Sequence, residues 1–368
     1  GGEAEELRRA FGMKRSQKRM EEIEAKLRAG MAANGVRGAA QEAIVQSIVS
    51  FALYGFPESH AASFALLAYA SAYLRCHYRA AYLAAMLNNQ PMGFYGPLTL
   101  VKDAQRHGLH FLPVEAAHSE WLCTPEKRNG ELCVRLGFNY LRGFRRQTAE
   151  AILAERARRP FSGIDDLARR VPSISKDEMN RLAEAGALNS LSREESGRRG
   201  ALWQAGLASR PAGELLAAAA PPEPPAPLAP MTAAERLAAD FRATGLTLGA
   251  HPMRFERPAL KERGVTAAGE IRGMRDGSRV RVAGAVICRQ QPATAKGFVF
   301  LSLEDETGIV NAILPPALFE AARAAVVQEP YLVVEGVLQN LQGVASVKAG
   351  RIEALRTARA AVLSHDFC

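Results

Sequence analysis

The first 200 residues place apolar and polar side chains with the period of α-helices. Residues 60–89 are apolar nearly all round in their first half, which indicates a buried pair of helices rather than a surface helix. One side of a helix over residues 39–53 carries Ile44, Val45, Ile48, Val49 and Ala52. The same reasoning predicts helices over residues 3–30, 98–107, 147–158, 163–170 and 176–185, and a strand over residues 110–114.

The last third of the chain changes to a β-rich pattern. Five strands are predicted over residues 280–287, 298–303, 309–314, 331–338 and 344–347. Asp305 to Gly308 form a hairpin turn between the second and third strands, and a helix over residues 318–327 lies between the third and fourth. Five strands with a helix at that place are the element order of an OB-fold barrel. The sequence therefore predicts an α+β multidomain chain that ends in such a barrel.

A proline-rich segment separates the two parts. Residues 217–230 hold six Ala and six Pro, which predicts an extended linker because proline fixes φ and removes a hydrogen-bond donor. After it, Thr232 and Glu235 have the spacing of a capping box, so a helix is expected from residue 233 to its end at Gly245.

The charge balance narrows the class of partner. The 368 residues carry 47 Lys and Arg against 38 Asp and Glu, a net charge of +9 with a pI near 9.5, which favours polyanions such as nucleic acid. The uncharged, mostly apolar run over residues 61–74 is shorter than the roughly 20 apolar residues that a bilayer-spanning helix needs, so no membrane partner is expected. Five scattered cysteines and the absence of an export signal predict a cytoplasmic protein.

The arginines gather in one segment. Residues 135–170 hold nine Arg and only four acidic residues, and within them two short turns each precede a helix, as in a tandem helix-hairpin-helix. In that motif the hairpin amides and the next helix N-terminus face a DNA phosphate. Arg145 stands where a second glycine is usual, so it needs a negative φ. A solvated arginine face on a helical bundle is the alternative. The candidate DNA contacts are Arg142, Gly143, Arg145, Arg146, Ser173, Ser175 and Lys176.

Two further places could contact a strand or a nucleotide. Ser59 and His60 stand at the start of a helix, where they could face a phosphate or serve as a plain helix cap. In the barrel, a basic and aromatic strand face is formed by Arg289, Lys296, Phe298 and Phe300. The alternative for both phenylalanines is a place in the barrel core.

The sequence offers no catalytic centre. Two-metal phosphoryl transfer needs converging carboxylates, and no Asp-x-Asp occurs here. The triplet from Glu304 to Glu306 leads into the predicted turn, and Asp165 with Asp166 fits a helix cap. Cys123 and Cys133 have no CxxC partner, so no metal site is expected. We therefore expect no catalytic residue and no bound cofactor in this chain.

Several long motifs resemble one family. Residues 54–95 (YGFPESHAASFALLAYASAYLRCHYRAAYLAAMLNNQPMGFY) are similar to the fingers of C-family bacterial DNA polymerases. Glu58 before Ser59 and His60 resembles the error-prone branch (the ImuC type), whereas the replicative DNA polymerase III alpha subunit has Lys there. The terminal SHDF and residues 244–253 (TGLTLGAHPM) and 289–308 (RQQPATAKGFVFLSLEDETG) agree as well.

The resemblance implies a division of the chain. Its parts would be the end of the fingers (1–115), a tandem helix-hairpin-helix (116–200), an Ala/Pro-rich linker (201–231), a helical connector (232–275), an OB-fold (276–356) and a C-terminal tail (357–368). Complete members of the family add a PHP domain, a thumb and a palm that holds the catalytic aspartates and Mg²⁺. The start at Gly1-Gly2, without a methionine, suggests a fragment that lacks them.

The resemblance also implies a function and partners. We expect the C-terminal portion of a damage-induced (SOS), translesion DNA polymerase, inactive alone, that contacts template–primer and single-stranded DNA. The parent enzyme would use deoxynucleoside triphosphates and work with a Y-family-like mutasome subunit, a small accessory protein and, indirectly, the sliding clamp. A stand-alone nucleic-acid-binding adaptor is the alternative. An anticodon-binding domain would rest on the barrel alone.

Overall fold

The computed structural model describes residues 17–54, 58–93, 95–192, 197–208, 226–292, 294–341, 344–356 and 365–367. It divides into two compact units, Gly1–His77 and Tyr78–Cys368, which are described one by one. Most elements follow the predicted ranges. The first part of the helix predicted over residues 3–30 lies outside the described residues.

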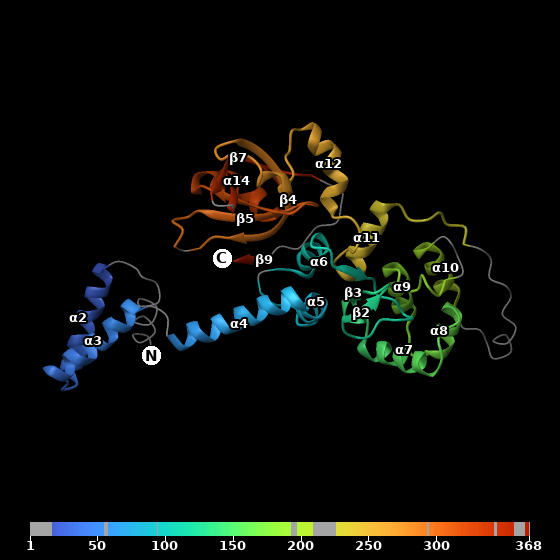
Figure 1. Cartoon of the computed structure of the whole chain (residues 1–368), viewed down its shortest axis with the longest axis horizontal. Coiled ribbons are helices and arrows are strands. Elements are labelled where there is room, and N and C mark those ends of the chain that lie inside the picture. Colours follow the sequence, from blue (N-terminus) through green and yellow to red (C-terminus); the bar gives the residue numbers. More distant parts are fainter. Residues whose placement is uncertain are drawn as a thin grey trace. The chain divides into compact units, whose positions relative to one another are not determined.

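The first unit consists of helices α2 (Gln17–Ala33), α3 (Ala39–Tyr54) and α4 (Glu58–His77) (Figure 1). Arg28 joins α2 to α3 through an ion pair with Glu42, whose closest N–O distance is 2.7 Å. The prediction of a buried helix was wrong for α4, because its side chains from His60 to His77 are exposed. Its all-round apolar pattern is typical of a helix that packs against other elements, but the side chains from His60 to His77 are exposed to solvent in this structure.

In the second unit, α5 (Arg79–Asn88) and α6 (Pro97–Arg106) pack near a small sheet of β1 (His110–Leu112), β3 (Glu131–Arg135) and β2 (Thr124–Arg128). Strands β2 and β3 form an antiparallel hairpin that the sequence analysis missed. Its turn residues Asn129 and Gly130 both have positive φ, as the tightest hairpin turns require.

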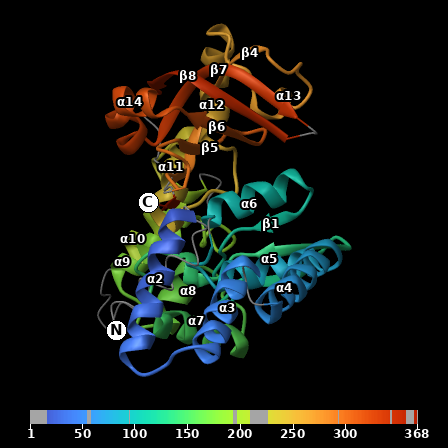
Figure 2. The same cartoon turned by 90° about the vertical axis from the view of Figure 1, so that its left-hand side faces the viewer.

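The three predicted helices follow, α7 (Arg146–Arg158), α8 (Ile164–Arg170) and α9 (Lys176–Ala185), and after them comes α10 (Arg198–Ala208), which was not predicted. Helices α8, α9 and α10 lie side by side in both views (Figures 1 and 2). Residues 201–208, which the linker prediction included, are helical in α10. The core between these helices consists of fully buried side chains, among them Phe138, Ile152, Leu167, Met179 and Leu182.

Helix α11 (Ala233–Thr244) confirms both of its predicted ends. Thr232 and Glu235 form the capping box, and Gly245 ends the helix with a φ of +77°. Helices α12 (Pro252–Glu262) and α13 (Ala268–Ile271) lie in the expected helical connector and lead into the barrel.

The barrel is the predicted OB-fold, built from β4 (Arg279–Gln290), β5 (Val299–Glu304), β6 (Ile309–Leu314), β7 (Tyr331–Leu341) and β8 (Val344–Ala354). The strands pair in the order β5-β6-β8-β7-β4, and β4 pairs with β5 to close the ring. Helix α14 (Pro316–Gln328) lies between β6 and β7 in the sequence, and β9 (His365–Phe367) extends the sheet beside β4. Apolar side chains from all five strands fill the interior.

Buried ion pairs hold the barrel against α6 and α12. Glu304, which is fully buried, pairs with Arg106 of α6 at 2.8 Å and accepts a hydrogen bond from Thr99. Asp305 pairs with Arg257 of α12 at 2.7 Å. The predicted role of this acidic triplet in the hairpin is confirmed for Asp305, which accepts from the Gly308 amide, but the triplet also ties two parts of the fold together. No helix among the described residues is long and apolar enough to cross a membrane.

Candidate nucleic-acid interface

The first hairpin, residues 141–145, is a tight turn that precedes α7. Gly143 has a φ of +68°, and a β-carbon there would lie 3.2 Å from the Arg181 guanidinium, so both the backbone and the space favour glycine. Arg145 has a φ of −80°, which meets the condition for an arginine at its position. The Arg142 amide donates to the Ala243 carbonyl at 2.8 Å, which anchors the hairpin to α11.

The second hairpin, residues 171–175, precedes α9. Ser175 caps this helix: its hydroxyl accepts from the Glu178 amide, and Glu178 accepts in return from the Ser175 amide at 3.0 Å. This capping box explains the serine at this position, because Ser is a favoured N-cap residue. The Ser173 carbonyl accepts from Arg145 at 2.9 Å and so joins the two hairpins.

Glu178 is the centre of this region. Its buried carboxylate accepts from the Arg145 amide at 3.2 Å, pairs with the Arg145 guanidinium at 2.7 Å and accepts from the Thr148 hydroxyl at 2.8 Å. Burial raises the pKa of this group, but hydrogen bonds from Arg145, Ser175 and Thr148 outweigh it and hold the pKa at about 2. Glu178 is therefore ionised at neutral pH and neutralises Arg145.

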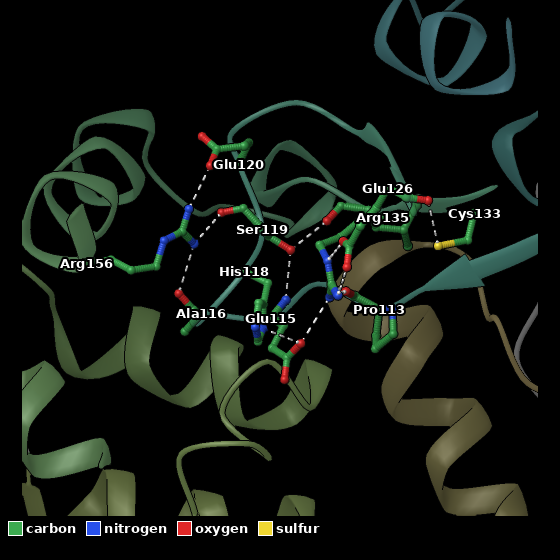
Figure 3. Close-up of polar contacts among 11 residues, drawn as sticks. Pro113, Glu115, Ala116, His118, Ser119, Glu120, Glu126, Cys133, Arg135 and Arg156 are labelled. Atoms are coloured by element: carbon green, nitrogen blue, oxygen red, sulfur yellow. Dashed lines mark hydrogen bonds and ion pairs between the residues drawn. The ribbon is translucent and has the colours of Figure 1, made fainter. Parts of the chain in front are cut away.

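Most arginines of the arginine-rich segment pair with carboxylates of the same chain. Eight of its nine arginines form ion pairs with carboxylates: Arg135, Arg145, Arg146, Arg156, Arg158, Arg159, Arg169 and Arg170. Figure 3 shows two of them. Arg135 lies between Glu115 and Glu126, and Arg156 binds Glu120 and two backbone carbonyls. The segment's net charge of +5 therefore overstates the cationic surface open to a ligand.

Exposed cations lie at both hairpins, and also at the far end of α7 (Arg158 and Arg159) and at Arg169 of α8. Arg142, Arg146 and Lys176 are exposed, and the Arg145 side chain is 55% exposed beside Glu178. Arg146 pairs with Glu150 only on the surface, where solvent screens the attraction. Among the described residues, Arg142 is the member of the arginine-rich segment for which no ion pair is found. Its guanidinium lies next to Gly245 at the end of α11.

One of the predicted barrel contacts, Arg289, has its guanidinium bound within the protein. The Arg289 guanidinium donates to the Glu329 carbonyl at 2.7 Å and to the Val326 carbonyl, so it binds the end of α14. Lys296 is exposed in the loop before β5. Phe298 and Phe300 are half-buried on the outer side, because the alternate residues Val299, Leu301 and Leu303 fill the core. The interpretation of both phenylalanines as core residues was wrong.

Strand register shows an outer face that sequence reasoning missed. Phe300, Ile313 and Lys348 are direct neighbours across β5, β6 and β8, and so are Ser302, Asn311 and Ser346. The Phe300 ring on β5 can stack on a base while Lys348, two strands away on β8, approaches a phosphate, and the polar row lies next to both. The alternation within each strand was visible in the sequence, but the pairing of β6 with β8 was not.

Family models match both regions. Residues 108–198 match the helix-hairpin-helix motif, and residues 265–355 match the OB-fold nucleic acid binding domain. An error-prone DNA polymerase from Anaeromyxobacter dehalogenans is 44% identical over 365 residues, which is 97% of this chain and 32% of that protein. Another from Aromatoleum aromaticum is 45% identical over 356 residues, or 95% of this chain and 33% of the relative. The chain is homologous to error-prone DNA polymerases. It spans about a third of the length of these relatives.

This polymerase homologue also matches part of a solved structure, the asparaginyl-tRNA synthetase from Pyrococcus horikoshii. The identity is 25%, the match covers 26% of this chain and 24% of that chain, and the TM-score is 0.22. So low a score carries no argument for the anticodon-binding alternative.

The predicted nucleotide-facing pair of the polymerase homologue is described only in part. Glu58 begins α4, and the Ser59 side chain lies outside the described residues, so its role as cap or phosphate ligand stays a prediction. His60 is exposed, and its ring centroid lies 4.4 Å from that of Phe64.

Proposed function

We propose that this chain supplies DNA contacts to an error-prone, translesion DNA polymerase and leaves the chemistry to the rest of that enzyme. The homology over 97% of the chain and the two nucleic-acid-binding modules support this proposal. The same homology disfavours the stand-alone adaptor, because the relatives continue over twice this length beyond the match.

The observation that carries the proposal is the open cationic start of α7. Arg142 and Arg146 are exposed on either side of the Gly143 turn, and the first turn of α7 contains no acidic residue. The N-cap amide of α7 already donates to Glu178, so a phosphate here would be held by the exposed Arg142 and Arg146 and by the partial positive charge of the helix start. Contacts of this kind position a duplex without reading its sequence, which suits a polymerase.

The outer face of the barrel extends the same function to single strands. Phe300 offers a stacking surface, Lys348 is exposed next to it through Ile313, and Asn311 is exposed in the adjacent row. Base stacking on aromatic rings tolerates any sequence. We infer that this face, with Lys296 and Phe298 in the nearby loop, holds the unpaired template.

The exposed helix α4 belongs to the same proposal. It presents large apolar side chains to solvent, including Leu66, Leu67 and Tyr69, which are 69%, 60% and 72% exposed. Contiguous apolar surface of this kind marks an interaction site. We propose that the two thirds of the polymerase outside this chain cover it, so that Ser59 and His60 come to face the incoming nucleotide.

The chemistry and the wider assembly are proposed for the complete enzyme. It would use Mg²⁺ and deoxynucleoside triphosphates and would work with a Y-family-like subunit and the sliding clamp. Within the described ranges, no three His, Cys, Asp or Glu side chains converge to hold a metal ion. These residues do not fit a Mg²⁺ site, so we derive no catalytic step from them.

The test is a titration of template–primer DNA at several salt concentrations. Replacing Arg142 and Arg146 together by Ala should reduce the slope of log K against log salt by about 1.8, because each lost phosphate contact removes about 0.9. Arg158→Ala is the matched control, since Arg158 is exposed at the other end of α7. An unchanged slope in the double variant would remove the first hairpin from the interface.

A further inference from the structure

The two hairpins differ in one respect that bears on DNA binding. We propose that Glu178 acts as an internal anion that takes up the N-cap donors of both hairpins, so that phosphate binding is confined to the first hairpin, where Arg142 and Arg146 stay exposed. This inference rests on the proposed function, since it concerns which part of the motif contacts DNA. It assigns Arg145 a positioning role rather than a phosphate contact.

The carboxylate of Glu178 receives the donors that a phosphate would need. The Ser175 amide, the N-cap of α9, lies 3.0 Å from it, and the Arg145 amide, the N-cap of α7, lies 3.2 Å from it. The Ser175 and Thr148 hydroxyls donate to it as well, at 3.0 and 2.8 Å. One buried carboxylate thus satisfies N-cap donors of both helices, and a phosphate could reach these groups only by displacing it. What distinguishes the hairpins is the charge that remains, since the first keeps the exposed Arg142 and Arg146 and the second keeps Lys176 beside Asp177.

The charges at the starts of α7 and α9 also favour phosphate binding at the first hairpin. The first turn of α9 contains Asp177 and Glu178, whereas the first turn of α7 contains no acidic residue. Carboxylates at an N-terminus stabilise the helix, but they repel a phosphate that approaches the same amides. The exposed Lys176 offsets only part of that charge. The second hairpin is therefore a poor site for an anion.

Arg145 is held by the same carboxylate. Its guanidinium pairs with Glu178 at 2.7 Å and donates to the Ser173 carbonyl at 2.9 Å. These bonds use its charge inside the protein and fix the second hairpin against the first. Arg146, one residue later, has only a solvent-exposed partner and remains available to a ligand. Adjacent arginines should therefore differ in their effect on DNA binding.

The experiment compares single variants of the intact chain by the salt dependence of template–primer binding. Arg146→Ala should reduce the slope of log K against log salt by about 0.9, which is one phosphate contact, whereas Arg145→Ala should leave it unchanged. Glu178→Gln should make the slope steeper by about 0.9, so that its affinity falls about 3.5-fold more than that of the wild type between 50 and 200 mM salt. The control is Glu235→Gln, because Glu235 has the same place in the capping box of α11.

Each outcome decides the question. A slope that falls equally in Arg145→Ala and Arg146→Ala would overturn the inference, as would a Glu178→Gln slope equal to that of Glu235→Gln. If Glu178→Gln does not fold, the comparison of the two arginines still decides. A wild-type chain that binds without salt dependence would remove the proposed function itself, which separates that failure from this one.

Discussion

The ionised Glu178 carboxylate should make the free energy of unfolding of the helical part of the second unit fall at acid pH. Its pKa lies at about 2 against 4.5 for a free side chain, and its side chain is 4% exposed. Each pH unit between these values corresponds to about 1.36 kcal/mol. Because the pKa is lowered in the folded state, the contribution is complete above pH 4.5 and is lost as the pH falls towards 2.

The expected magnitude follows from these two pKa values. Ionised Glu178 contributes about 3 kcal/mol at neutral pH, of which about 2 kcal/mol is lost between pH 7 and pH 3. Glu178→Gln keeps the size of the side chain and a capping-box residue but cannot ionise. The free energy of unfolding of this variant should be lower at pH 7 and should fall by about 2 kcal/mol less than that of the wild type down to pH 3.

The assay is urea unfolding followed by tryptophan fluorescence. The two tryptophans, Trp121 and Trp203, both lie in the helical part of the second unit, so the signal reports this part and not the barrel. Other carboxylates titrate equally in both proteins and cancel in the difference. Glu235→Gln is again the control, because that carboxylate is largely exposed. The free energies of unfolding of the wild type and Glu178→Gln would contradict this prediction if they fell equally between pH 7 and pH 3.

Three further predictions concern the barrel and α4. Arg106→Ala leaves Glu304 buried without its ion-pair partner, which should lower the free energy of unfolding, measured by circular dichroism, by about 3–5 kcal/mol. Adding Glu304→Gln should restore much of this loss, and no restoration would argue against a charge effect. Phe300→Ala should weaken single-strand binding by about 1–3 kcal/mol in fluorescence anisotropy, whereas Val327→Ala, at an exposed control position, should not. Equal affinities of Phe300→Ala and the wild type would exclude stacking on this face. Leu67→Glu should change the stability of this chain by less than about 0.5 kcal/mol because the side chain is exposed, yet lower primer extension by the complete polymerase; full activity would contradict the proposed cover of α4.

Local chemistry made much of the fold predictable. The capping box at Thr232, the left-handed glycine at Gly245 and the turn from Asp305 to Gly308 depend on neighbours within a few residues, and all three are confirmed. The β2–β3 hairpin was missed despite Asn129 and Gly130 at its turn, because β2 reads TPEKR and lacks the apolar alternation of a strand.

The candidate site depended on contacts that sequence cannot place. Ion pairs such as Arg145 with Glu178 and Arg135 with Glu115 join residues 33 and 20 positions apart, so a count of arginines overstated the open charge. Arg289 fits the pattern of a strand-binding residue, but the fold brings the end of α14 to it. The burial predicted for α4 failed for a similar reason, since an apolar pattern records a need for cover and not what provides it.

The most direct test of the central claim is amide hydrogen exchange of the intact chain with and without template–primer DNA. DNA should add protection over residues 142–147 and on β5, β6 and β8, with no change over residues 172–177, where Asp177 and Glu178 at the start of α9 repel a phosphate. Protection of the second hairpin but not the first, or no protection in either module, would contradict the account.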